Sequence, residues 1–182
     1  NKAERKNIVL AVGRMTAQKG FDNLIKSWAK IDQASKHNWT LRIVGPPGSA
    51  KPELEQLIQE FNLEQSVELV PASLQIESEY KQASMYVMSS RYEGFGLTLI
   101  EAMGQGLPVI AFNCPMGPSE IIADKYGRLL PPDDIEEMAT SIASFLADPE
   151  LRDEYGKLAY HRSEDYEPHK IIHHWTSMIN QL

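Results

Sequence analysis

Short apolar runs alternate along this chain with segments whose apolar residues recur at helical spacing, and this alternation constrains the fold most strongly. The first run, 7–13, is apolar almost throughout and ends at a glycine, which is typical of a parallel strand buried on both faces. The runs expected to form strands are 7–13, 39–45, 67–70, 85–88, 107–112 and 127–130. Helices between them predict an α/β fold: a Rossmann-like, doubly wound parallel sheet of about six strands.

The expected helices carry start signals of their own. Pro52 and Pro118 each suit the first turn of a helix, where a missing N–H does no harm. Asp134 and Glu137 have the spacing of a capping box. The expected helices are 21–31, a segment from Pro52 through Phe61, a segment around Tyr80, a helix with Glu101 in its first turn, 118–124, 134–146, a segment from 148, and a last helix from Pro168.

Length and composition limit the functions that the chain can have. Its 182 residues suit one domain, and a net charge of −7 argues against a nucleic-acid partner. The single cysteine, Cys114, excludes an internal disulfide and favours a reducing compartment, so we expect a cytoplasmic location. We interpret 1–182 as one domain, with polar residues 1–6 as a linker remnant from a longer protein and 168–182 as a terminal helix.

The stretch 89–103 sets two glutamates around a glycine-spaced loop, between an expected strand and an expected helix. Gly94 and Gly96 let the backbone approach a ligand closely. The N–H groups at the start of the following helix suit an anion such as phosphate. Because a carboxylate beside a phosphate would be repelled, Glu93 and Glu101 are expected to face hydroxyls. Such a site fits a phosphorylated sugar or a nucleotide sugar.

Arg14 and Lys19 follow the first expected strand and could supply cations to this ligand. A guanidinium fork and a compact ammonium would together clamp a diphosphate, and two solvated surface cations are the alternative. Ligands of doubly wound sheets bind beyond the carboxyl ends of the strands. The segments expected at that edge are 13–14, 45, 71–72, 89–96 and 113–117. The candidate residues are therefore expected to converge on one edge of the sheet.

The order of these residues resembles the signature of retaining glycosyltransferases of family four. Glu93, seven residues and Glu101 lie within Glu-Gly-Phe-Gly-Leu-Thr-Leu-Ile-Glu-Ala-Met, with Val-Gly-Arg and Lys-Gly upstream. The family often has Pro-Ser before the first glutamate, where this chain has Ser89-Ser90. Those enzymes have two Rossmann-like domains in the architecture called GT-B. This chain resembles only the second, C-terminal domain, which binds the donor.

The resemblance implies a role for each matching residue. Arg14 and Lys19 would bind the donor diphosphate and stabilise the leaving group, while Glu93 would lie beside the donor sugar. Glu101 would hold the ribose hydroxyls. The implied catalytic residues are Arg14, Lys19 and Glu93. The implied donor-binding residues are Gly13, Arg14, Lys19, Pro71, Ala72, Glu93, Gly94, Phe95, Gly96, Leu97, Thr98 and Glu101.

The resemblance further implies a bacterial hexosyltransferase that acts with retention in polysaccharide biosynthesis. UDP-hexose or UDP-N-acetylhexosamine is the favoured donor, because residues 114–122 resemble those of bacterial polysaccharide and glycoconjugate transferases. A missing N-terminal domain would carry the acceptor site, so the isolated domain is expected to bind donor but to be nearly inactive. Any peripheral membrane association would come through that missing domain.

No cofactor and no metal are expected, since the chain has no Asp-x-Asp motif and Asp133-Asp134 is better explained by helix capping. His169 and His173 are four residues apart, but no third ligand accompanies them. Three other functions remain open. A dinucleotide-binding domain would need a third glycine where position 99 is leucine. A non-catalytic sugar-nucleotide-binding module fits the same residues, whereas a sugar-nucleotide epimerase of GT-B architecture should lack the two-glutamate motif.

Overall fold

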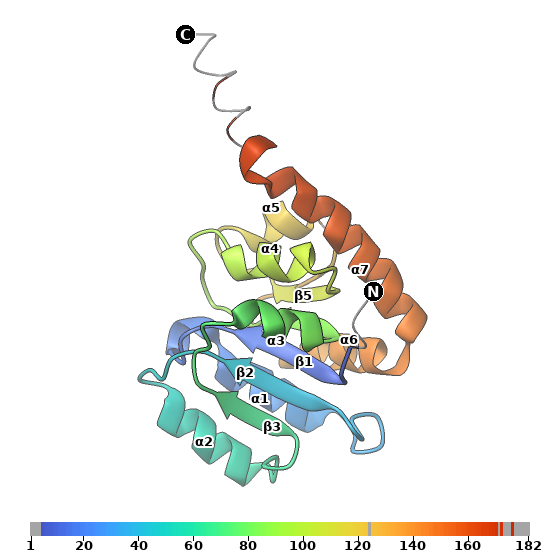
Figure 1. Cartoon of the computed structure of the whole chain (residues 1–182). Coiled ribbons are helices and arrows are strands. Elements are labelled where there is room, and N and C mark those ends of the chain that lie inside the picture. The colour runs from blue at the N-terminus through green and yellow to red at the C-terminus, as the bar shows by residue number, and fades with distance from the viewer. Residues whose placement is uncertain (1–4, 124, 171, 173–175, 177–182) are drawn as a thin grey trace.

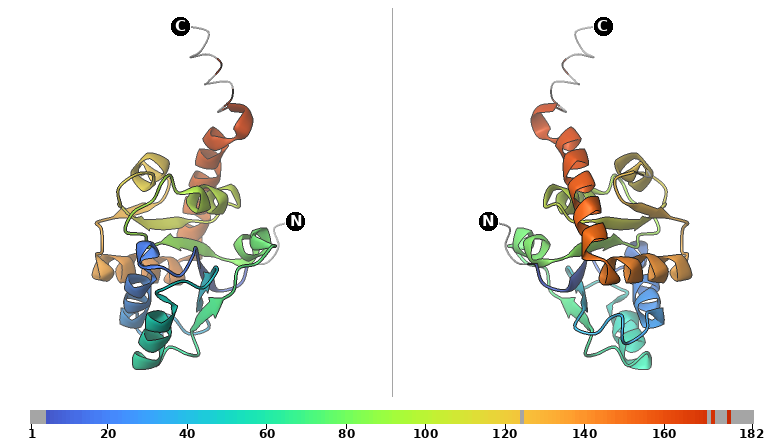
Figure 2. Two further views of the ribbon diagram at one scale, coloured as in Figure 1. Left: turned by 90° about the vertical axis from the view of Figure 1, so that its left-hand side faces the viewer. Right: turned by 90° about the vertical axis from the view of Figure 1, so that its right-hand side faces the viewer.

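The computed structural model contains a six-stranded parallel sheet with helices on both faces (Figures 1 and 2). It describes residues 5–123, 125–170, 172 and 176. The strands of this described part are β1 (Ile8–Val12), β2 (Thr40–Val44), β3 (Val67–Val70), β4 (Met85–Met88), β5 (Val109–Phe112) and β6 (Arg128–Leu130). Their order in the sheet is β3-β2-β1-β4-β5-β6, and every pairing is parallel. The predicted α/β fold is confirmed.

The helices follow the expected alternation with the strands. They are η1 (Ala17–Lys19), α1 (Phe21–Lys30), α2 (Lys51–Glu60), α3 (Ile76–Gln82), α4 (Leu97–Gly104), α5 (Pro118–Ile122), α6 (Ile135–Ala147), α7 (Pro149–Ser163) and η2 (Glu164–Tyr166). Asp134 caps α6 by accepting a hydrogen bond from the Glu137 N–H at 2.9 Å, as its spacing predicted. Asp148 starts α7 in the same way, by accepting from the N–H groups of Glu150 and Leu151.

One expected position in a helix is wrong. Glu101 was expected in the first turn of its helix, but α4 begins at Leu97 and has no acidic residue in its first turn. Gly96 adopts a left-handed conformation with φ 95° at the N-cap, so the helix starts directly after the glycine loop. Glu101 therefore lies one turn deeper in the helix than its place in the sequence indicated.

Two apolar clusters, one on each face of the sheet, hold the helices in place. Val9 and Ala11 point to the face covered by α1, α2 and α6, where Trp28 and Phe145 are fully buried. Ile8 and Leu10 point to the face covered by α3, α4, α5 and α7. This alternation along one strand is what a sheet buried on both faces requires.

The order in which strands are added to the sheet changes side between β1 and β4. From β1 the chain winds outward through β2 to β3, and it then returns to β4 on the other side of β1. The loops that follow β1 and β4 are therefore neighbours at the carboxyl edge of the sheet, at the switch point where such sheets bind ligands. These loops contain Lys19 and Glu93.

The two ends of the chain are described only in part. Within the expected linker 1–6, the Arg5 side chain donates hydrogen bonds to the carbonyl oxygens of Ala83 and Gln105, and the Lys6 N–H donates to the Gln82 oxygen. The expected terminal helix begins at Pro168 and is helical over 168–170, while most of 171–182 lies outside the described residues. None of the helices in the described part combines the length and apolarity needed to span a membrane.

Candidate functional site

Three loops meet at the carboxyl edge of the sheet, and two of the contacts between them allow no side chain. The loops follow β1, β4 and β5 and comprise residues 13–20, 89–96 and 113–117. A Cβ on Gly20 would lie 2.1 Å from the Ser89 carbonyl oxygen, and one on Gly117 would lie 2.0 Å from the Phe95 carbonyl oxygen. The backbone of the middle loop, 89–96, is thus pressed against both neighbours.

An ion pair joins the first two loops. The Lys19 ammonium lies 2.7 Å from Glu93 Oε1, and the two side chains are only 17% and 9% exposed. The Ser90 hydroxyl donates to the same carboxylate oxygen at 2.5 Å. The predicted convergence of Lys19 and Glu93 is therefore present, and the two side chains are each other's partners.

Arg14 lies beside this pair in the sequence but differs from Lys19 in its surroundings. Its side chain is exposed, and it forms no hydrogen bond or ion pair with the residues that the structure describes. Gly13 precedes it, and a Cβ there would lie 2.9 Å from Lys19 Cε. The Lys19 stem thus lies over the Gly13 backbone, which directs the ammonium toward Glu93.

The glycine loop leads directly into α4. Gly94, Phe95 and Leu97 are exposed, and Gly96 caps the helix without a side-chain hydrogen bond. The first-turn N–H groups of a helix have no partner within the helix, so they can bind an anion. Thr98 lies in this turn, and its side-chain oxygen accepts a hydrogen bond from the Tyr86 hydroxyl at 2.8 Å.

Glu101 lies on the exposed side of α4, apart from the Lys19–Glu93 pair in its contacts. Its Oε2 accepts a hydrogen bond from the buried Tyr80 hydroxyl at 2.8 Å. Burial, together with the charge of Glu101, raises the pKa of Tyr80 far above its ordinary value, so this phenol stays neutral and donates. The carboxylate of Glu101 is thereby held by one neutral hydroxyl.

Pro71 and Ala72 are the candidates that the structure connects least with the others. Both are exposed and follow β3, which is separated from β1 by β2. No hydrogen bond joins them to the other candidate residues, all of which the structure describes. They share the carboxyl edge with the site without contributing to its hydrogen bonds.

The site also contains residues that the sequence did not indicate. Ser90, Tyr80 and Tyr86 were not predicted to serve it, yet each bonds to a candidate residue. Ser90 lies three residues before Glu93 in the same loop, and this short spacing could have indicated a hydrogen bond between the two side chains. The two tyrosines carry no such signal, because they reach Glu101 and Thr98 from α3 and β4.

Cys114 lies buried beneath this edge of the sheet, at 2% exposure. Burial and the negative charge of Glu93 raise the pKa of its thiol, while Lys19 acts in the opposite direction. A thiol with a raised pKa is a poor nucleophile at neutral pH. Cys114 is therefore better explained as a buried structural residue than as a nucleophile.

The structure gives no metal site among the residues that it describes. No group of three or more histidine, cysteine, aspartate or glutamate residues in that part of the chain could hold an ion. His169 is exposed and pairs with Glu167 at 3.2 Å, and His173 lies outside the described residues. Asp134 caps α6, whereas Asp133 accepts a hydrogen bond from the Asn23 amide at 2.6 Å rather than capping a helix.

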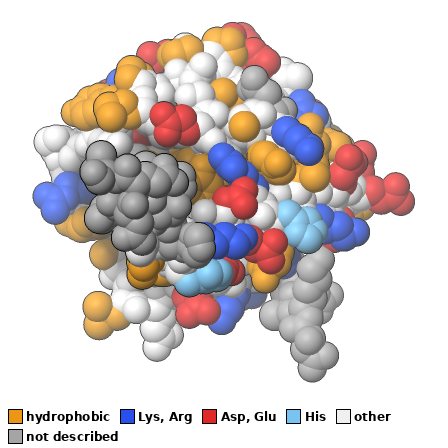
Figure 3. All heavy atoms as spheres, turned by 90° about the horizontal axis from the view of Figure 1, so that it is seen from above, with side chains coloured by type: hydrophobic (Ala, Val, Ile, Leu, Met, Phe, Trp, Pro, Cys, Tyr) orange, Lys and Arg blue, Asp and Glu red, His pale blue; other side chains and the backbone are white. Residues whose placement is uncertain are grey.

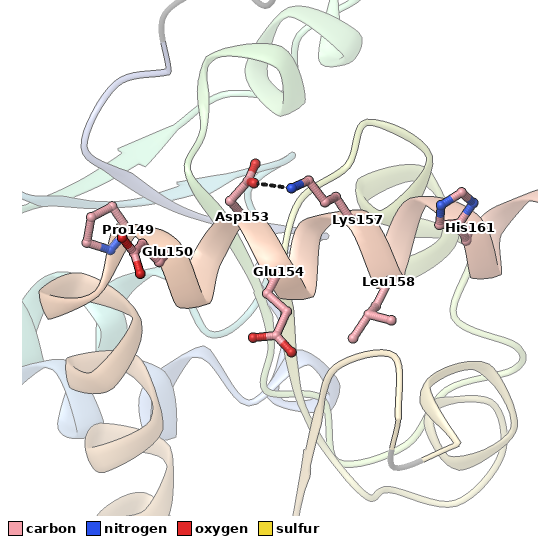
Figure 4. A pocket seen from close by; sticks show the side chains of 7 residues that line it. All are labelled: Pro149, Glu150, Asp153, Glu154, Lys157, Leu158 and His161. Carbon is pink, nitrogen blue, oxygen red and sulfur yellow. Dashed lines mark ion pairs between the residues drawn. The ribbon is translucent and has the colours of Figure 1, made fainter.

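A hollow along α7 is not lined by any of the candidate residues (Figure 4). It has a volume of about 570 Å³ and is lined by residues of α7 alone, including the Asp153–Lys157 ion pair. Lys157 and His161 also line a second hollow with Gly104–Gly106, the turn that precedes β5 at the amino end of the strands. The face in Figure 3 mixes cationic, anionic and histidine side chains, so it offers no surface of one charge to a polyanion.

Comparison with known proteins places this geometry in one family. The model of the family described as "Glycosyl transferases group 1" matches residues 1–162. The amylovoran biosynthesis glycosyltransferase AmsD of Erwinia amylovora is 38% identical over 98% of this chain and 49% of its own length. The poly(ribitol-phosphate) α-N-acetylglucosaminyltransferase of Staphylococcus aureus is 31% identical over 97% of this chain and 36% of its own length. The chain thus spans half or less of the curated relatives described here.

Solved structures agree with these sequence matches. A mutant of S. aureus TarM in complex with fondaparinux, α-GlcNAc-glycerol and UDP matches with a TM-score of 0.87 and 30% identity, over 96% of this chain and 36% of that one. The pneumococcal O-GlcNAc transferase GtfA in complex with UDP and GlcNAc matches with a TM-score of 0.81 and 26% identity, over 97% and 36%.

Proposed function

This chain belongs to the glycosyl transferases group 1 family, and on that premise we propose that it is the donor-binding half of a retaining hexosyltransferase. The proposed donor is a UDP-hexose or UDP-N-acetylhexosamine, and the proposed acceptor is a saccharide or glycoconjugate. Two similar proteins support this donor, since both were solved with UDP and one of them also with GlcNAc. Relatives named as biosynthetic glycosyltransferases support the acceptor class.

The observation that carries the proposal is the Lys19–Glu93 pair at the switch point of the sheet. The Lys19 ammonium lies 2.7 Å from the Glu93 carboxylate, and the exposed guanidinium of Arg14 follows the same strand as Lys19. These two cations form a site that can bind an anion, and Glu93 is the anion that Lys19 contacts in the structure. A diphosphate would give Lys19 a second anion of higher charge. Glu93, which also accepts from Ser90, would then accept a hydroxyl of the donor sugar.

The proposed chemistry is electrostatic. When the bond between the sugar and the nucleoside diphosphate breaks, negative charge develops on the phosphate and positive charge on the anomeric carbon. Arg14, Lys19 and the N–H groups at the start of α4 would stabilise the first, and Glu93 would stabilise the second. No metal is proposed, because these cations take over the charge that a metal would neutralise. The acceptor would enter on the same face of the sugar, which gives retention.

The other proposed donor contacts are more peripheral. Glu101 would accept the ribose hydroxyls, with Tyr80 holding its second oxygen. The backbone of Gly13 and of residues 94–98 would approach the phosphates and the sugar, and Pro71 and Ala72 would lie along the base. These assignments rest on the family resemblance together with the positions of these residues at one edge of the sheet.

The rest of the enzyme is proposed from the coverage of its relatives. Because the chain spans half or less of those relatives, an N-terminal half would supply the acceptor site, and the isolated domain would be nearly inactive. Any membrane association would come through that half. The single buried thiol of Cys114 is consistent with the proposed cytoplasmic location. The relatives described here give no support to an epimerase or a dinucleotide-binding domain.

Calorimetric titration of the 182-residue chain with UDP, GDP and ADP tests the proposal. We expect UDP to bind, and Arg14→Ala to weaken it about tenfold, since a charge-assisted hydrogen bond is lost. Lys81→Ala is the matched control, because Lys81 pairs only with Glu77 of its own helix among the described residues. Failure of all three nucleotides to bind, or equal affinities for wild type and Arg14→Ala, would refute the proposal.

A non-catalytic sugar-nucleotide-binding module would give the same titration. Transfer activity separates the two functions, because a binding module would neither hydrolyse nor transfer the sugar. The measurement is release of UDP from a panel of UDP- and GDP-sugars by the chain joined to its N-terminal half.

A further inference from the structure

Arg91 links the two loops that carry Lys19 and Glu93. Its backbone N–H donates to the Gln18 carbonyl oxygen at 2.8 Å, and its Nη1 donates to the Ala17 carbonyl oxygen at 2.6 Å. Both acceptors belong to η1, which ends at Lys19. Arg91 itself stands two residues before Glu93. The Arg91 side chain is thus hydrogen-bonded to the segment that carries Lys19, and Arg91 is close in sequence to Glu93.

The same guanidinium is anchored to α1 by a bidentate ion pair. Nη1 and Nη2 donate to the two carboxylate oxygens of Asp22 at 2.9 and 2.8 Å. Burial by itself would raise the pKa of Asp22, but the hydrogen bonds and charge of Arg91 lower it below the ordinary value. The side chains are 33% and 14% exposed, so the anchor is partly withdrawn from water. This is the planar fork geometry that arginine forms and lysine cannot.

Further bonds join the same segments. The Ser89 hydroxyl donates to the Lys19 carbonyl oxygen at 2.8 Å, and the Gln18 side-chain amide donates to the Tyr92 carbonyl oxygen at 3.0 Å. Arg91 Nε also lies 3.8 Å from Asp133 in the loop after β6. Arg91 is therefore the side chain at which loops from three strand ends meet.

We propose that Arg91, anchored by Asp22, is a positioning residue that fixes the Lys19 ammonium relative to Glu93 so that a donor diphosphate finds Lys19 preplaced. This inference rests on the proposed function of the same site. Arg91 is not a catalytic residue, because its guanidinium is occupied by Asp22 and the Ala17 carbonyl. It acts through the backbone of η1, whose position decides where the Lys19 side chain starts.

The difference between a positioning role and a merely structural one can be measured with a double-mutant cycle on UDP affinity. Arg91→Lys keeps the charge but loses the fork, and we expect it to weaken UDP binding by the 182-residue chain about tenfold. In a Lys19→Ala background the same change should weaken binding less than about twofold, because the side chain that Arg91 positions is already gone. Equal weakening in both backgrounds, or none in either, would overturn the proposal.

Arg42→Lys is the matched control. Arg42 also bonds to two carboxylates, those of Glu68 and Glu79, but it lies in the middle of β2 away from the site. We expect Arg42→Lys to leave the UDP affinity unchanged. A loss of affinity in Arg42→Lys equal to that in Arg91→Lys would also overturn the proposal, since general loosening would then explain both.

A second measurement needs no nucleotide, so it separates failure of the positioning role of Arg91 from failure of the proposed function. Cys114 is the only cysteine, it is buried, and the Glu93 N–H donates to the neighbouring Pro115 carbonyl oxygen at 3.3 Å. Arg91→Lys should therefore speed reaction of Cys114 with a thiol reagent about fivefold relative to Arg42→Lys at equal global stability. If wild type binds none of UDP, GDP and ADP, the proposed function fails, and equal thiol rates in the two variants would overturn the positioning role as well.

Discussion

Lys19→Met tests whether the Lys19–Glu93 pair contributes to the stability of the ligand-free domain. Methionine keeps an apolar stem over the Gly13 backbone, where a Cβ would lie 2.9 Å from Lys19 Cε, and it removes only the ammonium. Glu93, at 9% side-chain exposure, would then depend on the Ser90 hydroxyl for its hydrogen bonding. A carboxylate so withdrawn from water and without a cation is costly to keep ionised.

The magnitude follows from the geometry. Two unit charges 2.7 Å apart attract by about 6 kcal/mol at an effective dielectric constant of about 20, and desolvation cancels most of this. Removing one partner of a fully buried pair costs about 3–5 kcal/mol, whereas exposed pairs contribute about 0–1 kcal/mol. Because these side chains are 17% and 9% exposed, we expect Lys19→Met to lower the free energy of unfolding by about 2 kcal/mol.

Urea unfolding at neutral pH measures this change, and Lys30→Met is the matched control. Lys30 pairs with Glu136 at 2.6 Å, but its side chain is 46% exposed and that of Glu136 is 76% exposed, so the control should change stability by less than about 0.5 kcal/mol. Adding Glu93→Gln to Lys19→Met should recover part of the loss, because the uncompensated charge is removed. If Lys19→Met is no more destabilising than Lys30→Met, the pair does not stabilise the domain and our reasoning is wrong.

Three further predictions concern the residues around this pair. Gly117→Ala should lower the melting temperature by more than about 4 °C, because Gly117 has a φ of 99° and an added Cβ would lie 2.0 Å from the Phe95 carbonyl oxygen. Gly94→Ala is the control, because a Cβ there would meet nothing within 4 Å. Equal shifts in the two variants would contradict this prediction. Tyr80→Phe removes the donor to Glu101 and should weaken UDP binding about threefold by calorimetry. Tyr155→Phe is the control, because Tyr155 lies in α7 and packs against Phe145. Unchanged affinity in Tyr80→Phe, or an equal loss in Tyr155→Phe, would count against the prediction. The pKa of Asp22 is lowered in the folded state, so its contribution to stability is present above its unfolded pKa of about 4 and is lost as the pH falls through the folded value. The difference in unfolding free energy between wild type and Asp22→Asn should therefore shrink below about pH 4, and a pH-independent difference would show that Arg91 is not the cause.

The sequence predicted the sheet well because each strand has a local signal of its own. Runs such as 7–13 are buried on both faces, and this burial needs no knowledge of the neighbours. Pro118 and Asp148 likewise mark the starts of α5 and α7 by local chemistry. The start of α4 was less predictable, because Gly94 and Gly96 are both plausible ends of a loop. Only the φ of 95° at Gly96 shows which glycine caps the helix.

The sequence predicted which loops would lie together at the candidate site, but not which side chains would bond to each other. Strand order places the loops after β1 and β4 side by side, so Lys19 and Glu93 could be expected near each other. Their direct pairing could not, because it joins side chains 74 residues apart whose directions depend on both loops. The same applies to Arg91 and Asp22, whose bidentate ion pair joins side chains 69 residues apart.

Ser89 shows how a departure from a family pattern can acquire a physical meaning. Where related enzymes often have proline, the Ser89 hydroxyl donates to the Lys19 carbonyl oxygen at 2.8 Å. Proline has no side-chain donor and could not form this bond. In this chain, the two loops are therefore joined at this position by a hydrogen bond to the segment that carries Lys19, together with the Arg91 contacts to the same segment.

The two glutamates of the site differ in how firmly the protein holds them, and this difference matches the tasks proposed for them. Glu93 is nearly buried and accepts from both Lys19 and Ser90, so contacts within the protein fix its position. Glu101 is exposed and accepts from Tyr80 alone among the described residues, so it can adjust to its ligand at little cost. A group beside the reacting sugar gains from preorganisation, since charge stabilisation at the anomeric carbon depends steeply on distance. A group that only holds the ribose needs affinity rather than placement, and one neutral hydroxyl is sufficient to orient it.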